Sequence, residues 1–267
     1  MKYTIAFFII SVCMLSCNQK KTQETTDQTS KKIEEISTQD YPEAIHNVFE
    51  AHGGIDNWRK QQTLSYILPK PGNPETHTID LIKRFDKITS EDFDLGYDGS
   101  KPWVLAKDEN YEGNVDFYHN LMFYFFAMPF VLADDGIIYT PTEPIKFEGI
   151  QYPGIKISFN DGVGTSSKDE YYVHYNSQTN QMEWLGYTVT YRTGETSDKV
   201  NWIRYNDWGT YNTLKLPNSI SWYSVEDDKL IAVRNTVKFE AIQVSTEAMS
   251  KDFYKKPEGA IYFEKEN

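Results

Sequence analysis

The sequence predicts a mainly β fold with helices (α+β), in which one antiparallel sheet of about ten strands is strongly curved, or forms a half-barrel, and covers an N-terminal helix and an inserted apolar helix. Three observations predict this class. Beyond residue 40, short runs alternate apolar and polar side chains, as half-buried strands do. Asp-Gly pairs at 98–99 and 161–162 are typical of tight hairpin turns. One apolar run near the middle of the chain lacks this alternation and is predicted to be a buried helix. A large curled sheet needs a cover on its concave side, and this helix would provide it.

The chain begins with the pattern of a secretory signal peptide. Lys2 precedes an apolar run over residues 5–12, and Ser16 leads into Cys17. The apolar run is too short for a membrane-spanning helix, which needs about 20 residues. We therefore expect residues 1–16 to be removed and the Cys17 sulfur to receive a lipid, as in bacterial lipoproteins. An ordinary soluble secreted protein is the alternative.

Residues 17–40 are expected to form a lipid-attached flexible tether. This segment is rich in Thr, Gln, Lys, Glu and Ser, and its only aliphatic side chains are Ile33 and Ile36. Such a composition cannot bury enough apolar surface to offset the entropy of ordering. A coil of this length reaches about 25 Å, so residues 41–267, which are long enough for a single domain, would stay near the membrane.

Charge and cysteine content exclude several kinds of partner and site. The formal net charge is −12, and removing Lys2 with the signal makes it −13. A strongly negative protein repels phosphate backbones, so we expect no nucleic-acid partner and no electrostatic docking on anionic lipid. Membrane attachment is expected through the N-terminal acyl chains. Cys13 leaves with the signal and Cys17 takes the lipid, which leaves no thiol for a disulfide or a metal.

A helix is predicted directly after the tether. Asp40 is suited to cap it, Pro42 to its first turn, and Gly53 and Gly54 to its end. A shorter helical turn that contains Trp58 is expected to follow. The predicted helix presents one apolar stripe, which consists of Ala44, Ile45, Val48, Phe49 and His52.

Strands are predicted where the alternation has a period of two residues. This period gives each strand one buried and one exposed face. The predicted strands are 63–68, 77–85, 87–95, 103–107, 155–159, 170–175, 184–191, 202–205, 219–224 and 229–242.

An inserted helix is predicted over residues 115–133. Its run from Leu121 to Leu132 is apolar on every side, which is typical of a buried helix. Pro129 interrupts the run, which is also shorter than the roughly 18 residues of a membrane span. We therefore expect a plug or lid beneath the curved sheet.

Several short motifs resemble those of an uncharacterised lipoprotein family of Bacteroidota. They are Ala51-His52-Gly53-Gly54, Tyr97-Asp98-Gly99, Phe125-Phe126-Ala127-Met128-Pro129-Phe130, Lys168-Asp169-Glu170-Tyr171 and Trp184-Leu185-Gly186-Tyr187. By its organisation this family resembles the LolA, LolB and LppX type of open β-barrel, which implies a curved sheet over helices that binds acyl chains. The resemblance also implies the periplasmic face of the outer membrane, because no acidic residue occurs between Cys17 and Glu24.

No catalytic motif is found, and no cofactor is expected. The sequence lacks a Gly-x-Ser-x-Gly elbow and a phosphate-binding loop. Its five histidines are not spaced as a helical zinc pair, so no metal site is expected. Aromatic residues make up 15% of the chain, and they either fill the core or line a cavity. The candidates for lining a ligand cavity are Phe123, Phe126, Phe130, Trp184, Trp202 and Trp222.

The leading hypothesis is a membrane-anchored periplasmic lipoprotein that binds or carries a hydrophobic ligand, an acyl chain or a lipid, without catalysis. Two alternatives stay open. A structural subunit of an envelope complex would expose an apolar patch. An envelope hydrolase or glycan-acting protein would use paired carboxylates, for which the candidates are Asp134-Asp135, Asp169-Glu170 and Asp227-Asp228.

Overall fold

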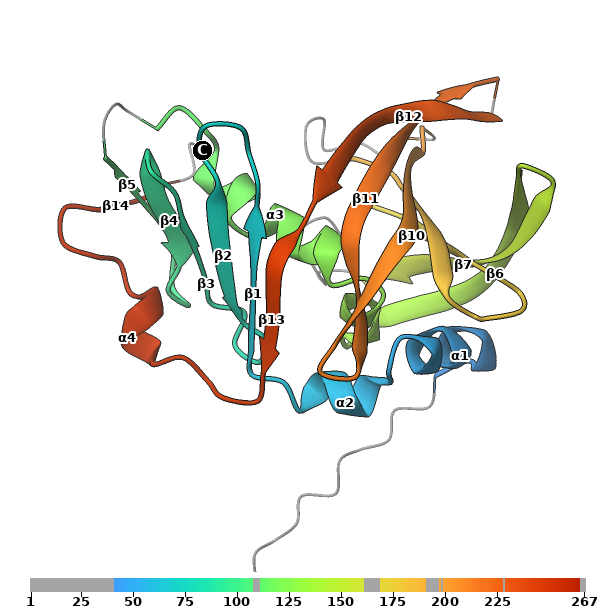
Figure 1. The fold of residues 1–267 in the computed structure, drawn as a ribbon, viewed down its shortest axis with the longest axis horizontal. Coiled ribbons are helices and arrows are strands. Elements are labelled where there is room, and N and C mark those ends of the chain that lie inside the picture. Colours follow the sequence, from blue (N-terminus) through green and yellow to red (C-terminus); the bar gives the residue numbers. More distant parts are fainter. Residues whose placement is uncertain are drawn as a thin grey trace, which may run out of the picture. The chain divides into compact units, whose positions relative to one another are not determined.

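Two antiparallel sheets of seven strands form the framework of the protein (Figure 1). The computed structural model describes residues 41–107, 111–160, 169–190, 197, 199–227 and 229–264. The predicted signal peptide, Cys17, the tether with Asp40 and the Asp161-Gly162 turn lie outside these residues. Within the described part, no helix is long and apolar enough to cross a membrane.

The first sheet has the strand order β13-β1-β2-β3-β4-β5-β14. In β3, Asp86 and Ile88 are buried whereas Thr89 is exposed, as the two-residue period of a strand requires. The strands of this sheet are β1 (Thr63–Leu68), β2 (Glu75–Asp80), β3 (Asp86–Thr89), β4 (Phe93–Tyr97), β5 (Pro102–Ala106), β13 (Glu240–Ser245) and β14 (Ile261–Tyr262).

The second sheet is a meander with the order β12-β11-β10-β9-β8-β7-β6. Its strands are β6 (Ile137–Phe147), β7 (Ile150–Phe159), β8 (Tyr171–Tyr175), β9 (Met182–Tyr187), β10 (Asn201–Tyr211), β11 (Leu214–Glu226) and β12 (Lys229–Lys238). After β12 a single residue, Phe239, leads into β13 of the first sheet. This passage is drawn in red-orange in Figure 1 and takes the chain directly from one sheet to the other.

In the described part of the chain, four short helices and one longer helix, α3, accompany the sheets, and α3 contacts the first sheet. They are α1 (Glu43–Ala51), α2 (Ile55–Arg59), α3 (Val115–Phe126), the 3-10 helix η1 (Phe130–Ala133) and α4 (Lys251–Tyr254). The side chain of Asn114 caps α3 by accepting the N–H of Phe117 at 3.0 Å. α3 then contacts β3, β4 and β5, whereas η1 contacts α2.

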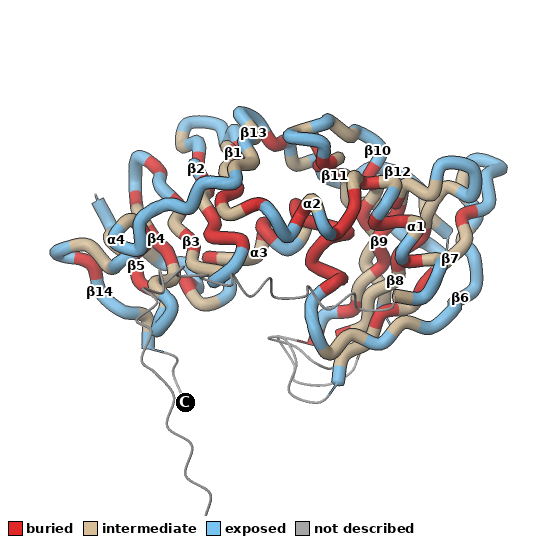
Figure 2. Tube along the Cα trace, turned by 90° about the horizontal axis from the view of Figure 1, so that it is seen from below, coloured by how far each residue is buried: buried red, intermediate tan, exposed pale blue. Residues whose placement is uncertain are grey.

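One large core contains side chains from both sheets and from the helices. Leu64 of β1, Phe126 of α3 and Ile203 of β10 belong to the same group of buried residues. Figure 2 shows buried stretches along α3, β8 and β9, with exposed turns at the periphery. We name residues 115–133 the insert, because they join the first sheet to the second and place most of their buried apolar side chains in this shared core.

The predicted class, mainly β with helices and antiparallel pairing, is confirmed. The strands form two sheets of seven, instead of one sheet of about ten. Two strands that the sequence did not reveal contribute to this difference. β6 contains Pro141 and Pro144, which a sheet tolerates at its edge but which interrupt the expected alternation. β14 has only two residues.

Several other boundaries also differ from prediction. The inserted helix ends at Phe126 and continues as η1, because Pro129 has no N–H for a helical hydrogen bond. The predicted strand 87–95 is divided between β3 and β4 by a turn at Ser90. Pro42 is the N-cap residue of α1 and does not belong to its first turn.

Candidate functional site

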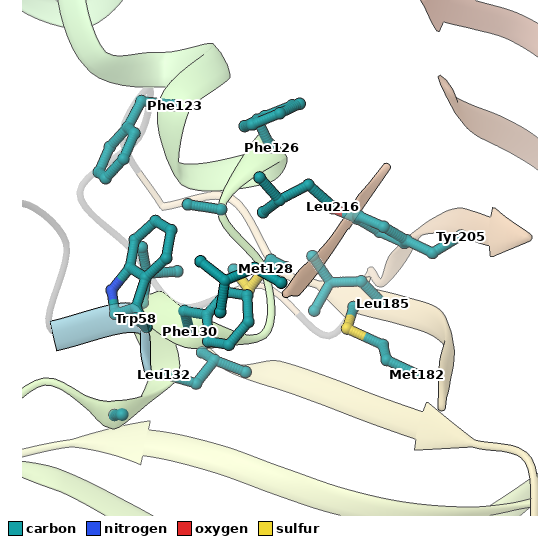
Figure 3. Close-up of a cluster of buried hydrophobic side chains, with 14 of the residues drawn as sticks. Trp58, Phe123, Phe126, Met128, Phe130, Leu132, Met182, Leu185, Tyr205 and Leu216 are labelled. Carbon is teal, nitrogen blue, oxygen red and sulfur yellow. The ribbon is translucent and has the colours of Figure 1, made fainter. Parts of the chain in front are cut away.

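The three phenylalanines predicted to line a cavity are buried against other side chains of the protein (Figure 3). Phe126 lies 4.5 Å from Tyr66 and 4.6 Å from Phe239, measured between ring centroids. Phe130 stacks on Trp58 at 4.7 Å with only 5° between the ring planes. Phe123 is 3% exposed. The insert therefore fills this part of the core with its own aromatic rings.

The three tryptophan candidates do not lie together with these phenylalanines. Trp184 and Trp202 point away from the core, because the next residue of each strand, Leu185 and Ile203, points into it. Trp184 is nevertheless fully buried, since Phe147 and Tyr223 cover it with centroids at 4.9 Å each.

Trp222 is the one tryptophan candidate that reaches the insert. Its ring lies 5.8 Å from that of Phe125, and its indole N–H donates to the Tyr187 hydroxyl at 3.0 Å. The structure thus brings together Trp222 and the insert, and it places Trp184 and Trp202 on the opposite face of the second sheet. That the six residues contact a ligand stays a prediction.

Three tyrosine hydroxyls hold the C-terminal half of the insert. Tyr205 of β10 donates to the Phe125 carbonyl at 2.8 Å, and Tyr41 donates to the Ala133 carbonyl at 3.0 Å. Tyr139 of β6 donates to the Leu132 carbonyl. These carbonyls lie where helical hydrogen bonding ends, so each would otherwise lack a donor. The bonds fix the irregular part of the insert to three separate elements.

A buried Asp-His pair attaches the first half of the insert to the first sheet. His119 Nδ1 and Asp86 Oδ2 are 2.6 Å apart, and both side chains are buried. Burial raises the pKa of Asp86 to about 6, although the hydrogen bond and charge of His119 act in the opposite direction. The Tyr97 ring stacks on His119 with its centroid 5.5 Å away. The pair therefore positions α3 on β3 and β4.

A second buried carboxylate, Glu75, binds Tyr118, the residue of α3 that precedes His119. Its two oxygens accept hydrogen bonds from Tyr118 at 2.6 Å and Lys70 at 2.7 Å, and His77 lies 3.3 Å away. Burial by itself would raise the pKa of Glu75, but these three partners together lower it. The Glu75 carboxylate is therefore hydrogen-bonded within the protein, and these contacts explain why it is buried.

A pocket at the C-terminal end of the insert has a volume of about 370 Å³. We name it the Arg59 pocket. Trp58, Leu81 and Ala133 contribute buried apolar side chains to its floor, whereas charged residues from three segments are more exposed and form its rim. Its lining consists of Trp58, Arg59, Gln61, Leu81, Ile82, Arg84, Ala133, Asp134 and Asp135.

One ion pair is already formed at this rim. Arg84 donates through Nη2 to both carboxylate oxygens of Asp134, at 2.9 and 3.0 Å. Burial raises the pKa of Asp134, and the charge of Arg84 opposes the rise. Arg84 has a φ of 60°, a conformation that is costly for a residue with a side chain. Its guanidinium also lies over the Phe123 ring at 5.1 Å, so it links the pocket to the insert.

The other two charges of the pocket remain open to solvent. Arg59 donates through Nη2 to the Tyr41 hydroxyl at 2.9 Å. Neither Arg59 nor Asp135 forms an ion pair within 4.0 Å in the described part of the chain. From the sequence, Asp134 and Asp135 were predicted only as a carboxylate pair, and Arg59 and Arg84 were not predicted as site residues. Arg59 ends a short helix and Arg84 lies in a turn, and no sequence spacing distinguishes them from other surface arginines.

The remaining paired carboxylates have structural partners or lie at a turn. Asp169 accepts the N–H of Thr190 at 2.7 Å, and Glu170 pairs with Lys156 at 2.6 Å. Asp227 lies in the turn between β11 and β12, and Asp228 lies outside the described residues. Among the described residues, no group of three His, Cys, Asp or Glu side chains is arranged to hold a metal ion.

The solved structures that resemble this chain include the following three. A DUF1329 family protein from Desulfovibrio piger is 10% identical, with 75% of this chain and 92% of that chain covered and a TM-score of 0.48. A LolA superfamily protein from Nitrosomonas europaea is 7% identical, with 73% and 89% covered and a TM-score of 0.42. A domain assigned to outer membrane lipoprotein sorting, from Vibrio parahaemolyticus, is 8% identical, with 76% and 96% covered and a TM-score of 0.38.

Comparison with curated proteins gives no match. A family model matches residues 57–238, which extend from α2 to the end of β12 and include the insert. The prediction of an uncharacterised family is therefore confirmed, and the chain belongs to DUF6503, a family of unknown function.

Proposed function

We propose that this protein is a lipid-anchored protein of the periplasmic cell envelope that binds a hydrophobic ligand, an acyl chain or a lipid, without catalysis. The insert acts as a plug in the space that the ligand would take. The anchor is the Cys17 sulfur, and the signal and tether sequences support it.

The observation that supports the proposal best is the position of the insert between two apolar surfaces. Phe126 packs on Tyr66 of the first sheet, while its neighbour Phe125 packs on Tyr187 of the second sheet at 5.2 Å. A ligand tail that replaces these rings would bury comparable apolar surface, at about 25 cal/mol per Å². Exchange of one apolar group for another therefore costs little free energy. Ligand binding by this route does not require an open, water-filled cavity beforehand.

The polar attachments of the insert determine how it would move. Its first half is held by the buried Asp86–His119 pair, and its second half by hydroxyl groups of tyrosines. A hydrogen bond between neutral groups contributes only about 1 kcal/mol net, whereas a hydrogen bond to a charged group contributes about 1.5–3 kcal/mol. We therefore expect the second half, residues 125–133, to leave the core while α3 keeps its place on the first sheet.

Lipid binding and plug displacement are tested on the chain from Asn18 onward, which contains no cysteine. Native mass spectrometry should find a co-purified lipid, and a fluorescent fatty acid should bind. Tyr205→Phe removes one attachment of the plug and should strengthen fatty-acid binding about two- to tenfold, the equivalent of one hydrogen bond.

The matched control is Tyr262→Phe, because the Tyr262 hydroxyl donates to Asp98 at 2.7 Å and does not contact the insert. It should leave the affinity unchanged. A single Val131→Cys substitution should react faster with a thiol reagent when the fatty acid is present. A protein that is always recovered without lipid, binds no fatty acid and protects Val131→Cys under all conditions would refute the proposal.

A further inference from the structure

The Arg59 pocket adjoins the plug and has the dimensions of a ligand site. Its volume of about 370 Å³ falls within the range of small-molecule pockets, roughly 300–1,000 Å³. Trp58 forms part of its floor and stacks on Phe130 of the plug. The pocket and the proposed tail space are thus separated by these two rings.

The charges of the pocket are balanced in sign. Arg84 and Asp134 neutralise one another through two short contacts. Arg59 and Asp135 remain, one positive and one negative, without an ion-pair partner in the described residues. A simple anion would be repelled by Asp135, and a simple cation by Arg59. The complementary ligand carries both charges.

We propose that the Arg59 pocket binds a zwitterionic group, an ammonium joined by a short linker to a phosphate, with the phosphate on Arg59 and the ammonium on Asp135. This inference rests on the proposed function, because it identifies the head group of the hydrophobic ligand. The same chemistry occurs in a phosphatidylethanolamine head group and in free phosphoethanolamine, so the test includes both sources.

The orientation of Arg59 suits this role. A guanidinium offers five N–H donors in a planar fork that matches phosphate oxygens. The bond from Arg59 Nη2 to the Tyr41 hydroxyl uses one of these donors and leaves the others for a ligand. Tyr41 in turn donates to the carbonyl of Ala133, the last residue of η1. Binding at Arg59 is therefore connected to the end of the plug through one side chain.

The test uses the full acylated chain in a nonionic detergent, with native mass spectrometry to count added ligands. The probes are short-chain phosphatidylethanolamine, short-chain phosphatidylglycerol and free phosphoethanolamine. We expect the wild-type chain to prefer phosphatidylethanolamine over phosphatidylglycerol by about tenfold. Asp135→Asn should abolish this preference, and Arg59→Gln should weaken both phospholipids.

Two charge-matched substitutions outside the pocket serve as controls. Lys60→Gln and Glu247→Gln change exposed residues that do not line the pocket, and both should preserve the preference. Arg59→Lys keeps the charge without the fork and should give an intermediate affinity. Circular dichroism of each variant confirms that it is folded.

The outcomes separate this inference from the proposed function. Lipid binding that ignores the head group and is unchanged in Asp135→Asn overturns the inference and leaves the proposed function standing. If only free phosphoethanolamine binds, and Asp135→Asn abolishes this binding, the result supports a zwitterion site in the Arg59 pocket and contradicts the proposed lipid binding. Binding of none of the three probes overturns both.

Discussion

At the level of single residues, His52 joins three elements that are distant in sequence. It follows the last residue of α1, and its Nε2 accepts the N–H of Met182 in β9 at 3.1 Å. Its Nδ1 lies 3.4 Å from the carbonyl of Lys215 in β11, which assigns the proton of the neutral ring to Nδ1. The sequence predicted that His52 belongs to the apolar stripe of the helix, but a single chain cannot reveal the two distant partners.

Because His52 is buried, we predict that it makes the fold sensitive to acid. Burial lowers its pKa to about 4, from 6.5 in an unfolded chain. The unfolded state therefore binds the proton first, so this contribution to stability is complete above pH 6.5 and is lost as the pH falls through about 4. His52→Gln should reduce the loss of stability between pH 7 and 4.5, measured by urea unfolding. His46→Gln, within α1, is the control, and an equal reduction there would contradict the assignment.

At the level of elements, the end of α1 depends on a close approach between two backbones. Gly53 has a φ of 106°, and a Cβ at this position would lie 2.3 Å from the carbonyl oxygen of Thr213. Thr213 lies in the turn between β10 and β11. The paired glycines were predicted to end the helix, and they do, but the contact with a turn some 160 residues later requires the tertiary fold.

Gly53→Ala should therefore destabilise the protein much more than an alanine at a glycine without neighbours. Both the strained φ and the clash with Thr213 contribute, so we expect a loss of about 2–4 kcal/mol in the free energy of unfolding. Gly72→Ala is the matched control, because Gly72 has a φ of 82° but no atom within 4 Å of the added Cβ. Urea unfolding of the two variants measures the difference, and similar losses would show that the approach to Thr213 is unimportant.

Elements were predictable where local pattern and tertiary environment agree. The predicted strand 63–68 coincides with β1, in which burial alternates from Leu64 to Leu68. The predicted strand 229–242 covers two strands in different sheets, since nothing in its alternation marks the change at Phe239. β6 was missed because its prolines are acceptable only at an edge, and edge position is a property of the whole sheet.

At the level of the whole molecule, the burial of the insert was predictable and its surroundings were not. A run that is apolar on every side is typical of a buried segment, and Phe123, Phe126 and Phe130 are buried as expected, whereas Tyr124 of the same run is exposed. The Arg59 pocket is formed by α2, the turn after β2 and the end of η1, and its lining extends from residue 58 to residue 135 of the chain. Such an assembly leaves no local signature in the sequence.

The direct passage from β12 to β13 predicts that the two sheets unfold together. Phe239 is the residue between them, and its ring packs on Tyr66 of the first sheet and Phe126 of the insert. Phe239→Ala should lower the free energy of unfolding by about 3–5 kcal/mol and keep a single transition, since one core serves both sheets. Urea unfolding followed by tryptophan fluorescence and by far-ultraviolet circular dichroism should give coincident curves. Phe253→Ala, in α4 and outside this core, should cost much less. Two separated transitions in the wild-type chain would show that the sheets are independent and that Phe239 does not couple them.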